Sequence, residues 1–298
     1  MERHEDMGFG DGPSRRQILG AGALAVAGAA VSSAVWTPPA AAAAAAKSPA
    51  IFYSPHQDDE AIGMAGSILE HKAAGRPVHL VLVSRGENDG LAKIMNQGDC
   101  TTLGSRCSAP GHRHALGWPE DGASKVVAAR TAEFTLSAKA LGVDKVINFN
   151  LADGAYGDYD AFVGQVVKKV RALAEQYPGA SHKFAAGWLD GNATHKACSD
   201  AAHRLMKNGE LTDVRFHHIY AYQQYPPAER DRGAAYVLRI PSAQMERKRK
   251  SILAYNTWDP SRNLYSLGYH SVPEWLEQAY ADPREFVYTL PSNYRPGR

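Results

Sequence analysis

Residues 50–60 read Ala50-Ile51-Phe52-Tyr53-Ser54-Pro55-His56-Gln57-Asp58-Asp59-Glu60. The apolar run at 50–53 predicts a short buried strand. One imidazole and three carboxylates follow it within five residues. The acid preference of a helix N-terminus explains Asp59 and Glu60, but it does not explain His56. Carboxylates this close repel one another unless a cation neutralises them. We therefore expect His56 and one of the two aspartates to bind a divalent metal, with the other aspartate free to act as a base.

Strand-like and helix-like runs alternate along the rest of the chain. The expected strands cover residues 78–83, 145–149, 183–186 and 216–222, and the expected helices cover residues 61–74, 125–141, 160–176 and 195–206. Such alternation predicts an α/β fold, Rossmann-like, with a mostly parallel sheet and helices on both faces. Ligands of these folds bind at the carboxyl ends of the strands, which is where His56 falls. We therefore place the metal site at this edge.

A catalytic zinc ion usually has three protein ligands and one open position for water. The best candidate for a third ligand is His195, because residues 190–195 follow an expected strand and open a helix. Most other histidines fall inside expected helices or strands, and we interpret them as structural: His71, His79, His203, His217 and His218. His112 and His114 lie in a long loop and could join the site.

That loop covers residues 87–122 and is rich in Gly, Asn and Pro. Long loops in compact domains are usually functional or mobile. It follows a strand at the same edge as His56, so we expect a lid over the site; a surface insertion is the alternative. The loop holds Cys100 and Cys107, for which we expect a disulfide rather than two free thiols, while Cys198 falls in a helical pattern and should be buried.

Residues 1–46 resemble an export signal, with paired Arg15 and Arg16 before an apolar run and an alanine tract. The arginine pair is similar to that of twin-arginine signals. We expect cleavage in the alanine tract and a secreted protein without stable membrane association; an uncleaved signal would act as a membrane anchor. Residues 47–298 should then form a single domain, with a C-terminal cap at about 223–298.

The charge of the chain is close to balance, at +2. No long basic face is implied, which argues against a nucleic-acid partner. The basic run at 247–250 is interpreted as the solvated face of a helix. The partner should be a small-molecule or oligosaccharide substrate, and the oligomeric state is left open.

The segment His56-Gln57-Asp58-Asp59-Glu60 resembles the signature of the PIG-L/LmbE-like N-acetylglucosaminyl deacetylases, in which Pro is usual at the second position. Further parts of the family pattern follow in order between about residues 50 and 222: Ser84-Arg85-Gly86-Glu87, Arg130-Thr131-Ala132-Glu133, Leu141-Gly142-Val143, Asp153-Gly154 and His195-Lys196-Ala197. A single motif would carry little weight, whereas this ordered set is specific.

The resemblance implies a metal-dependent hydrolase that removes an acetyl group from an amide nitrogen on an N-acetylglucosamine-type sugar. It assigns zinc, or ferrous iron, to His56, Asp59 and His195. Asp58 would be the general base. Arg130 and Asp153 resemble residues that hold sugar hydroxyls in relatives. Trp188 is the aromatic residue that we place nearest the metal.

The sequence departs from the family pattern at one position. Relatives usually carry His-Pro-Asp-His where this chain has Asn192-Ala193-Thr194-His195. The histidine that assists the oxyanion in relatives is therefore Asn192, whose amide can donate a hydrogen bond but cannot supply a proton. Two alternatives stay open: an amidase acting on an acylated metabolite or thiol conjugate, and a catalytically weakened saccharide-binding relative.

Overall fold

A computed structural model describes residues 48–100, 103, 106, 108–109, 111–119 and 124–297. All of them belong to one compact unit that spans Pro38–Arg298. The expected export signal and Cys107 lie outside the described residues. Among the described helices, none is both long and apolar enough to cross a membrane.

The described residues form one seven-stranded sheet and two short hairpins. Its strands are β1 (Ala50–Ser54), β2 (Val78–Ser84), β5 (Lys145–Leu151), β6 (Ser181–Ala185), β7 (Val214–His217), β8 (Tyr236–Arg239) and β11 (Arg284–Tyr288). They lie in the order β5-β2-β1-β6-β7-β11-β8. The first five run parallel, and β11 is antiparallel to both β7 and β8. The predicted mostly parallel sheet is confirmed.

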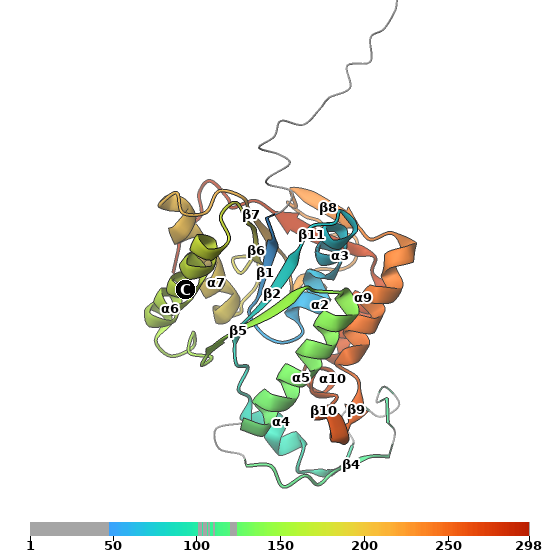
Figure 1. Cartoon of the computed structure of the whole chain (residues 1–298). Coiled ribbons are helices and arrows are strands. Elements are labelled where there is room, and N and C mark those ends of the chain that lie inside the picture. Colours follow the sequence, from blue (N-terminus) through green and yellow to red (C-terminus); the bar gives the residue numbers. More distant parts are fainter. Residues whose placement is uncertain are drawn as a thin grey trace, which may run out of the picture. The chain divides into compact units, whose positions relative to one another are not determined.

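Helices cover both faces of this sheet (Figure 1). One face carries α6 (Tyr159–Gln176) and α7 (Ala193–Lys207), and the other carries α2 (Asp59–Gly63), α3 (Ala65–Ala73), α5 (Ser124–Leu141), α9 (Ser242–Ala254) and α11 (Pro273–Ala281). Side chains of β1 alternate between the two cores: Ile51 and Tyr53 join the first, while Phe52 joins the second. This burial on both faces explains why β1 reads as an unbroken apolar run.

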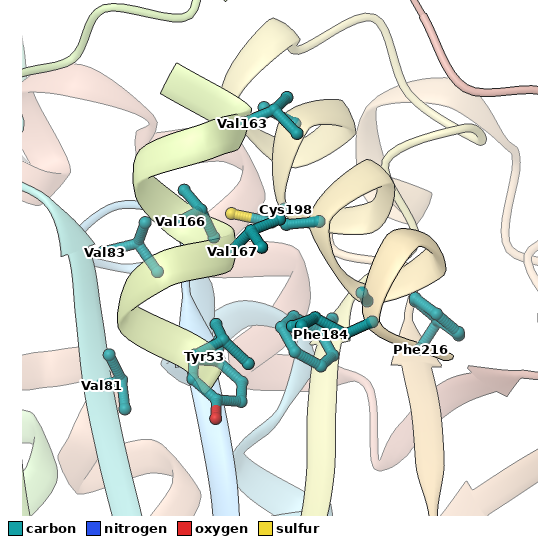
Figure 2. Packing of buried hydrophobic residues seen from close by; sticks show 14 of the residues in the cluster. Tyr53, Val81, Val83, Val163, Val166, Val167, Phe184, Cys198 and Phe216 are labelled. Carbon is teal, nitrogen blue, oxygen red and sulfur yellow. The ribbon is translucent and has the colours of Figure 1, made fainter. Parts of the chain in front are cut away.

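Aromatic rings and valines fill the core beneath α6 and α7. The ring of Tyr53 stacks on that of Phe184, with centroids 4.3 Å apart. Figure 2 shows Cys198 of α7 packed close to Val167 of α6 in this cluster. The prediction that Cys198 is buried is confirmed.

The chain changes direction across the sheet at β1. From β1 it proceeds outward to β2 and β5, then returns to β6 on the other side of β1. Such a switch point opens a crevice at the carboxyl ends of the two central strands. The loop after β6 lies very close to α7, because a Cβ on Gly187 would meet the backbone carbon of His195 at 2.2 Å. Glycine at 187 therefore allows His195 to sit directly behind the strand end.

The segment at 87–122 contains more structure than the expected loop. It holds α4 (Asp89–Ile94) and a small hairpin of β3 (Gly98–Asp99) and β4 (Arg113–His114). Its apolar side chains Leu91, Met95 and Trp118 are buried together with residues of α5. Cys100 carries a free thiol among the described residues, and Cys107, its expected disulfide partner, lies outside them.

The C-terminal segment is more than a cap. Besides β8 and β11, which extend the sheet, it contains β9 (Trp258–Asp259), η2 (Pro260–Arg262), β10 (Leu264–Tyr265) and α10 (Leu267–Ser271). The expected solvated face at 247–250 is wrong for Lys248, which is fully buried with its Nζ 3.5 Å from Glu285. The expected strand at 216–222 is wrong beyond His217, because the chain turns there into α8 (Ala221–Gln224).

Candidate active site

The turn after β1 presents its acidic residues on a constrained backbone. Asp58 has a φ angle of 99°, a region that aspartate enters more readily than most residues but that still costs free energy. The backbone N–H of His56 donates to Asp59 Oδ2 at 2.8 Å, and Ser54 Oγ donates to the carbonyl of His56 at 2.7 Å. These local bonds fix the direction in which each side chain leaves the turn.

Three buried side chains meet at the crevice. Asp59 Oδ2 lies 3.1 Å from His195 Nε2 and 3.3 Å from His56 Nδ1. One ligand atom from each of these residues lies within 4.8 Å of the others. Asp59 and His195 are fully buried, and His56 is 8% exposed. The structure thus brings together the three residues predicted as metal ligands.

The far nitrogen of each imidazole is held by a second carboxylate. His195 Nδ1 lies 2.9 Å from Asp190 Oδ2, and His56 Nε2 lies 3.2 Å from Asp153 Oδ2. This leaves His195 Nε2 and His56 Nδ1 facing Asp59. Histidine ligands in metalloproteins are oriented by such outer carboxylates, which fix the tautomer and raise ligand basicity.

The electrostatics of the cluster call for a cation. Burial alone would lower the pKa of His56, but hydrogen bonds and charge from Asp153 and Asp59 raise it to about 9. Burial likewise opposes a charge on His195, yet Asp59 and Asp190 raise its pKa well above the ordinary value. Asp59 Oδ1 and His195 Nε2 are buried without hydrogen-bond partners. Two imidazoles and one carboxylate therefore fit zinc or ferrous iron.

Asp58 lies beside this cluster, in contact with Arg130. Arg130 Nη2 lies 3.4 Å from Asp58 Oδ2 and donates to the carbonyl of Gln57 at 3.0 Å, while Nη1 donates to the carbonyl of Gly86 at 3.1 Å. Burial raises the pKa of Asp58, and the Arg130 guanidinium partly offsets this effect. A raised pKa suits a residue that takes up and returns a proton. Arg130 supports the turn in addition to any contact with substrate.

Asp153 and Asn192, which were expected to contact the substrate or the oxyanion, form hydrogen bonds with other groups of the protein. Asp153 accepts from Thr194 Oγ1 at 2.6 Å, in addition to its contact with His56. Asn192 is the N-cap of α7, where its Oδ1 accepts from the backbone N–H groups of Thr194 and His195. Its Nδ2 lies 3.4 Å from the hydroxyl of Tyr220 and is the end of the amide available to a ligand.

Two cavities lie beside the His56-Asp59-His195 cluster, and Asn192 lines both of them. One of about 610 Å³ is lined by Tyr156, Asn192, Tyr220 and Trp275, among others. Another of about 330 Å³ is lined by Trp188, Asp190 and Asn192, among others. Trp188 also packs edge-on against Phe216, with centroids 4.9 Å apart. The larger cavity offers aromatic faces, and the ring centroid of its Tyr220 lies 4.6 Å from that of His195.

Sequence reasoning missed Asp190, Thr194 and Tyr220 as parts of the site. Asp190 and Thr194 lie in the segment 190–195 that was predicted to supply His195. Their closeness to His195 in the sequence could have identified them. Tyr220 was hidden because residues 216–222 were expected to continue as a strand. Its position depends on the turn after β7, which the pattern did not predict.

The protein thus has a doubly wound α/β fold with a buried His-Asp-His set at its switch point. A family model described as GlcNAc-PI de-N-acetylase matches residues 51–206. The chain belongs to this PIG-L family, as its motifs predicted. No curated protein matches the sequence.

Solved structures share the fold at low sequence identity. A deacetylase triple mutant from the teicoplanin biosynthetic pathway has a TM-score of 0.56 at 15% identity, with 80% of this chain and 96% of that chain covered. The A40926 pseudoaglycone deacetylase has a TM-score of 0.53 at 16% identity, covering 81% and 96%. The 4-carboxy-2-hydroxymuconate hydratase from Pseudomonas putida has a TM-score of 0.53 at 16% identity, covering 84% and 99%. The same fold therefore also occurs in a protein that is named a hydratase.

Proposed function

We propose that this protein is a metal-dependent hydrolase that removes an acetyl group from the amide nitrogen of an N-acetylglucosamine-type sugar. The observation that carries the proposal is the convergence of His56, Asp59 and His195 beside the buried carboxyl of Asp58. Membership of the PIG-L family and the deacetylase names of two structures with the same fold support this reaction.

Each residue of the site would have a distinct chemical role. His56, Asp59 and His195 would hold zinc, which as a Lewis acid would lower the pKa of water at such a site to about 7. Asp58 accepts the proton of the attacking water and later returns a proton to the departing amine. The amide C–N bond breaks, and acetate and a free amino sugar are released. The Nδ2 group of Asn192 donates to the oxyanion that forms during attack.

Three aromatic residues support a sugar as the substrate. Tyr156, Tyr220 and Trp275 line the larger cavity beside Asn192. Flat rings suit the apolar faces of pyranoses, and the volume of about 610 Å³ is within the range of small-molecule sites. An acylated metabolite or thiol conjugate would present the same amide and is the alternative substrate class.

Acetate release from a panel of substrates tests this function. The panel contains N-acetylglucosamine glycosides, chito-oligosaccharides, N-acylated glycopeptide sugars and an acetylated thiol conjugate. We expect release from at least one amino sugar, and release slowed by about 100-fold or more in the Asp58→Asn variant. Release from the thiol conjugate alone would replace the sugar with the alternative substrate class. Binding of a sugar without any release would favour the second function below.

A saccharide-binding protein without turnover is the second candidate. The observation that favours it is Asn192, whose side-chain oxygen caps α7 and whose amide cannot supply a proton. Isothermal titration with the same panel separates the two candidates, because a binding protein shows affinity for a sugar that it leaves acetylated.

We also propose that the protein is exported through the twin-arginine route. The support is the pair Arg15-Arg16 directly before the apolar run at 18–35. Substitution of both arginines by lysine should abolish secretion of the native chain and leave the precursor in the cytoplasm. Secretion of the double variant at the native level would contradict this route. Mass analysis of the secreted chain should give an N-terminus within or just after the alanine tract at 40–46.

A further inference from the structure

We propose that Cys100, His112, His114 and His270 form a second metal site, a structural zinc site that joins the segment at 89–119 to the C-terminal part of the domain. One ligand atom from each of these four residues lies within 4.8 Å of the others. None of them belongs to the His56-Asp59-His195 cluster. The site is independent of the proposed reaction and goes beyond it.

The four residues come together from two distant parts of the chain. Cys100 follows β3 and His114 ends β4, and the pairing of Gly98 with His114 brings these strands side by side. His270 arrives from α10, and its Nε2 lies 3.5 Å from Cys100 Sγ. Figure 1 shows β4, α4, β9, β10 and α10 gathered at the lower end of the sheet domain.

The three imidazoles are oriented in the same way. The Nδ1 atoms lie close to backbone carbonyl oxygens: His112 at 2.6 Å from Ala109, His114 at 3.1 Å from Ile94, and His270 at 2.8 Å from Ser266. A carbonyl oxygen only accepts, so each Nδ1 carries the hydrogen. The lone pair of each neutral ring is then on Nε2, the nitrogen that points into the cluster. Zinc-binding histidines are commonly fixed by such carbonyl contacts.

The distances indicate which ion the cluster suits. Zn–S and Zn–N bonds of about 2.3 and 2.05 Å at a tetrahedral angle place sulfur and nitrogen about 3.6 Å apart. The observed separation of Cys100 Sγ and His270 Nε2, 3.5 Å, matches this edge. The Nε2 atoms of His112 and His114 are 2.5 Å apart. Two nitrogens of a zinc site are about 3.3 Å apart, so these rings would separate by somewhat less than 1 Å on binding.

Four donors fill the coordination sphere of tetrahedral zinc and leave no position for a water or substrate. Closed sites of this kind are structural, whereas catalytic sites keep one position open. The mixture of one thiolate and three imidazoles favours zinc over the hard cations magnesium and calcium, which prefer oxygen ligands. The second site therefore differs in function from the cluster at His56.

A metal link would stabilise the surrounding segment. Hairpins with strands as short as β3 and β4 are marginally stable by themselves. The buried apolar residues that hold the segment form a small cluster around Leu91, Met95 and Trp118. The ring of Trp258 in β9 stacks on that of His112, with centroids 3.6 Å apart, and on that of His114, with centroids 5.6 Å apart. A metal here would connect residues 100–114 with residue 270 and so close a long loop.

Metal content and cobalt spectroscopy of the purified full chain test the proposal. With saturating cobalt we expect two bound ions per chain and a thiolate-to-cobalt charge-transfer absorption. Only the second site has a sulfur ligand, so this absorption reports on it alone. Cys100→Ser and His270→Ala should each lose the absorption and one ion. His195→Ala should also lose one ion but keep the absorption.

Two other cysteines provide controls. Cys198→Ala, in the core beneath α6, should keep both ions and the absorption. Cys107→Ser should keep the absorption as well. Absorption that survives Cys100→Ser and disappears in Cys107→Ser would overturn the ligand assignment. A single ion per chain in the wild type without thiolate absorption would overturn the site, as would a Cys100–Cys107 disulfide that persists under the reducing conditions used for metal loading.

Limited proteolysis tests the structural role separately. Arg113, whose side chain is 72% exposed, lies between His112 and His114 and is a trypsin site. We expect zinc to slow cleavage after Arg113 at least tenfold in the wild type. In Cys100→Ser the zinc effect should vanish, while near-ultraviolet circular dichroism remains that of a folded core. Equal cleavage rates with and without zinc in the wild type would contradict the role.

Discussion

Asp190 Oδ2 lies 2.9 Å from His195 Nδ1, and both side chains are completely buried. This contact directs His195 Nε2 toward Asp59 and His56. A neutral imidazole with Nδ1–H held by a carboxylate is a stronger metal ligand than a free one. Asp190 would therefore be a positioning residue for the proposed metal centre, although it was not predicted as one.

Replacement of Asp190 should weaken the metal centre. We expect Asp190→Asn to lower zinc affinity at the His56-Asp59-His195 cluster by about 10- to 100-fold, the usual effect of losing an outer carboxylate. Competition with a chromogenic chelator measures the change. Asp160→Asn, at an exposed position in the first turn of α6, is the matched control and should leave the affinity unchanged.

Removal of the general base should slow turnover without emptying the site. Asp58→Asn should reduce kcat by about 10²- to 10⁴-fold, the usual contribution of a positioned acid–base group. Asparagine tolerates a positive φ angle, so the turn itself should persist. Metal analysis of the variant should give the wild-type content. Full turnover in Asp58→Asn would contradict the assignment.

Different variants separate the capping of α7 by Asn192 from its proposed contact with the oxyanion. Asn192→Ala removes the cap of α7 and should lower the free energy of unfolding by about 1 kcal/mol. Asn192→Ser keeps a good capping residue, so its stability should stay close to that of the wild type. If Nδ2 donates to the oxyanion, both variants should lose about 10²- to 10³-fold in kcat.

Urea unfolding and steady-state kinetics on both variants check this division. Wild-type kcat in Asn192→Ser would contradict the oxyanion contact and leave Asn192 a structural cap. Equal destabilisation by serine and alanine would contradict the capping assignment.

Stability should fall in acid because some histidines are buried in the neutral form. Burial lowers the pKa of His217 to about 3, and His217 Nδ1 lies 3.1 Å from the carbonyl oxygen of Gly63. Between about pH 6.5 and pH 3 the unfolded chain binds a proton at this residue that the folded chain does not. The contribution of His217 to the free energy of unfolding is complete above pH 6.5 and is lost as the pH falls toward 3, at about 1.4 kcal/mol per pH unit.

The variant His217→Asn tests this pH dependence. It should reduce the slope of unfolding free energy against pH by about one proton between pH 6 and 4. Urea titrations with a chelator present keep metal release from contributing to the result. An unchanged slope would mean that another group accounts for the acid sensitivity.

The sequence predicted the elements that bear the proposed metal ligands. The apolar run at 50–53 forms β1, and His56 leaves its carboxyl end as expected. His195 could be placed opposite because parallel strands end at one edge of a sheet. The contacts of Asp190, Asp153 and Thr194 could not be predicted in the same way, since they depend on side-chain directions within loops.

Contacts between residues far apart in the sequence were harder to predict. Residues 216–222 are rich in aromatic and apolar side chains, yet the chain leaves the strand after His217 and enters α8 at Ala221, while the His218 N–H donates to the carbonyl of Phe286 in β11. The Cys100 cluster needs His270, which joins it only through tertiary packing of α10. Neither contact has a local pattern in the sequence.

The most direct test of the central claim is acetate release by the same protein before and after metal removal. We predict that the chelated protein releases no acetate from its amino-sugar substrate and that added zinc or ferrous iron restores release. His195→Ala reconstituted with zinc or ferrous iron should remain inactive, while its cobalt-loaded form should keep the thiolate-to-cobalt absorption of the second site. Undiminished acetate release from protein shown to be free of metal would contradict the account.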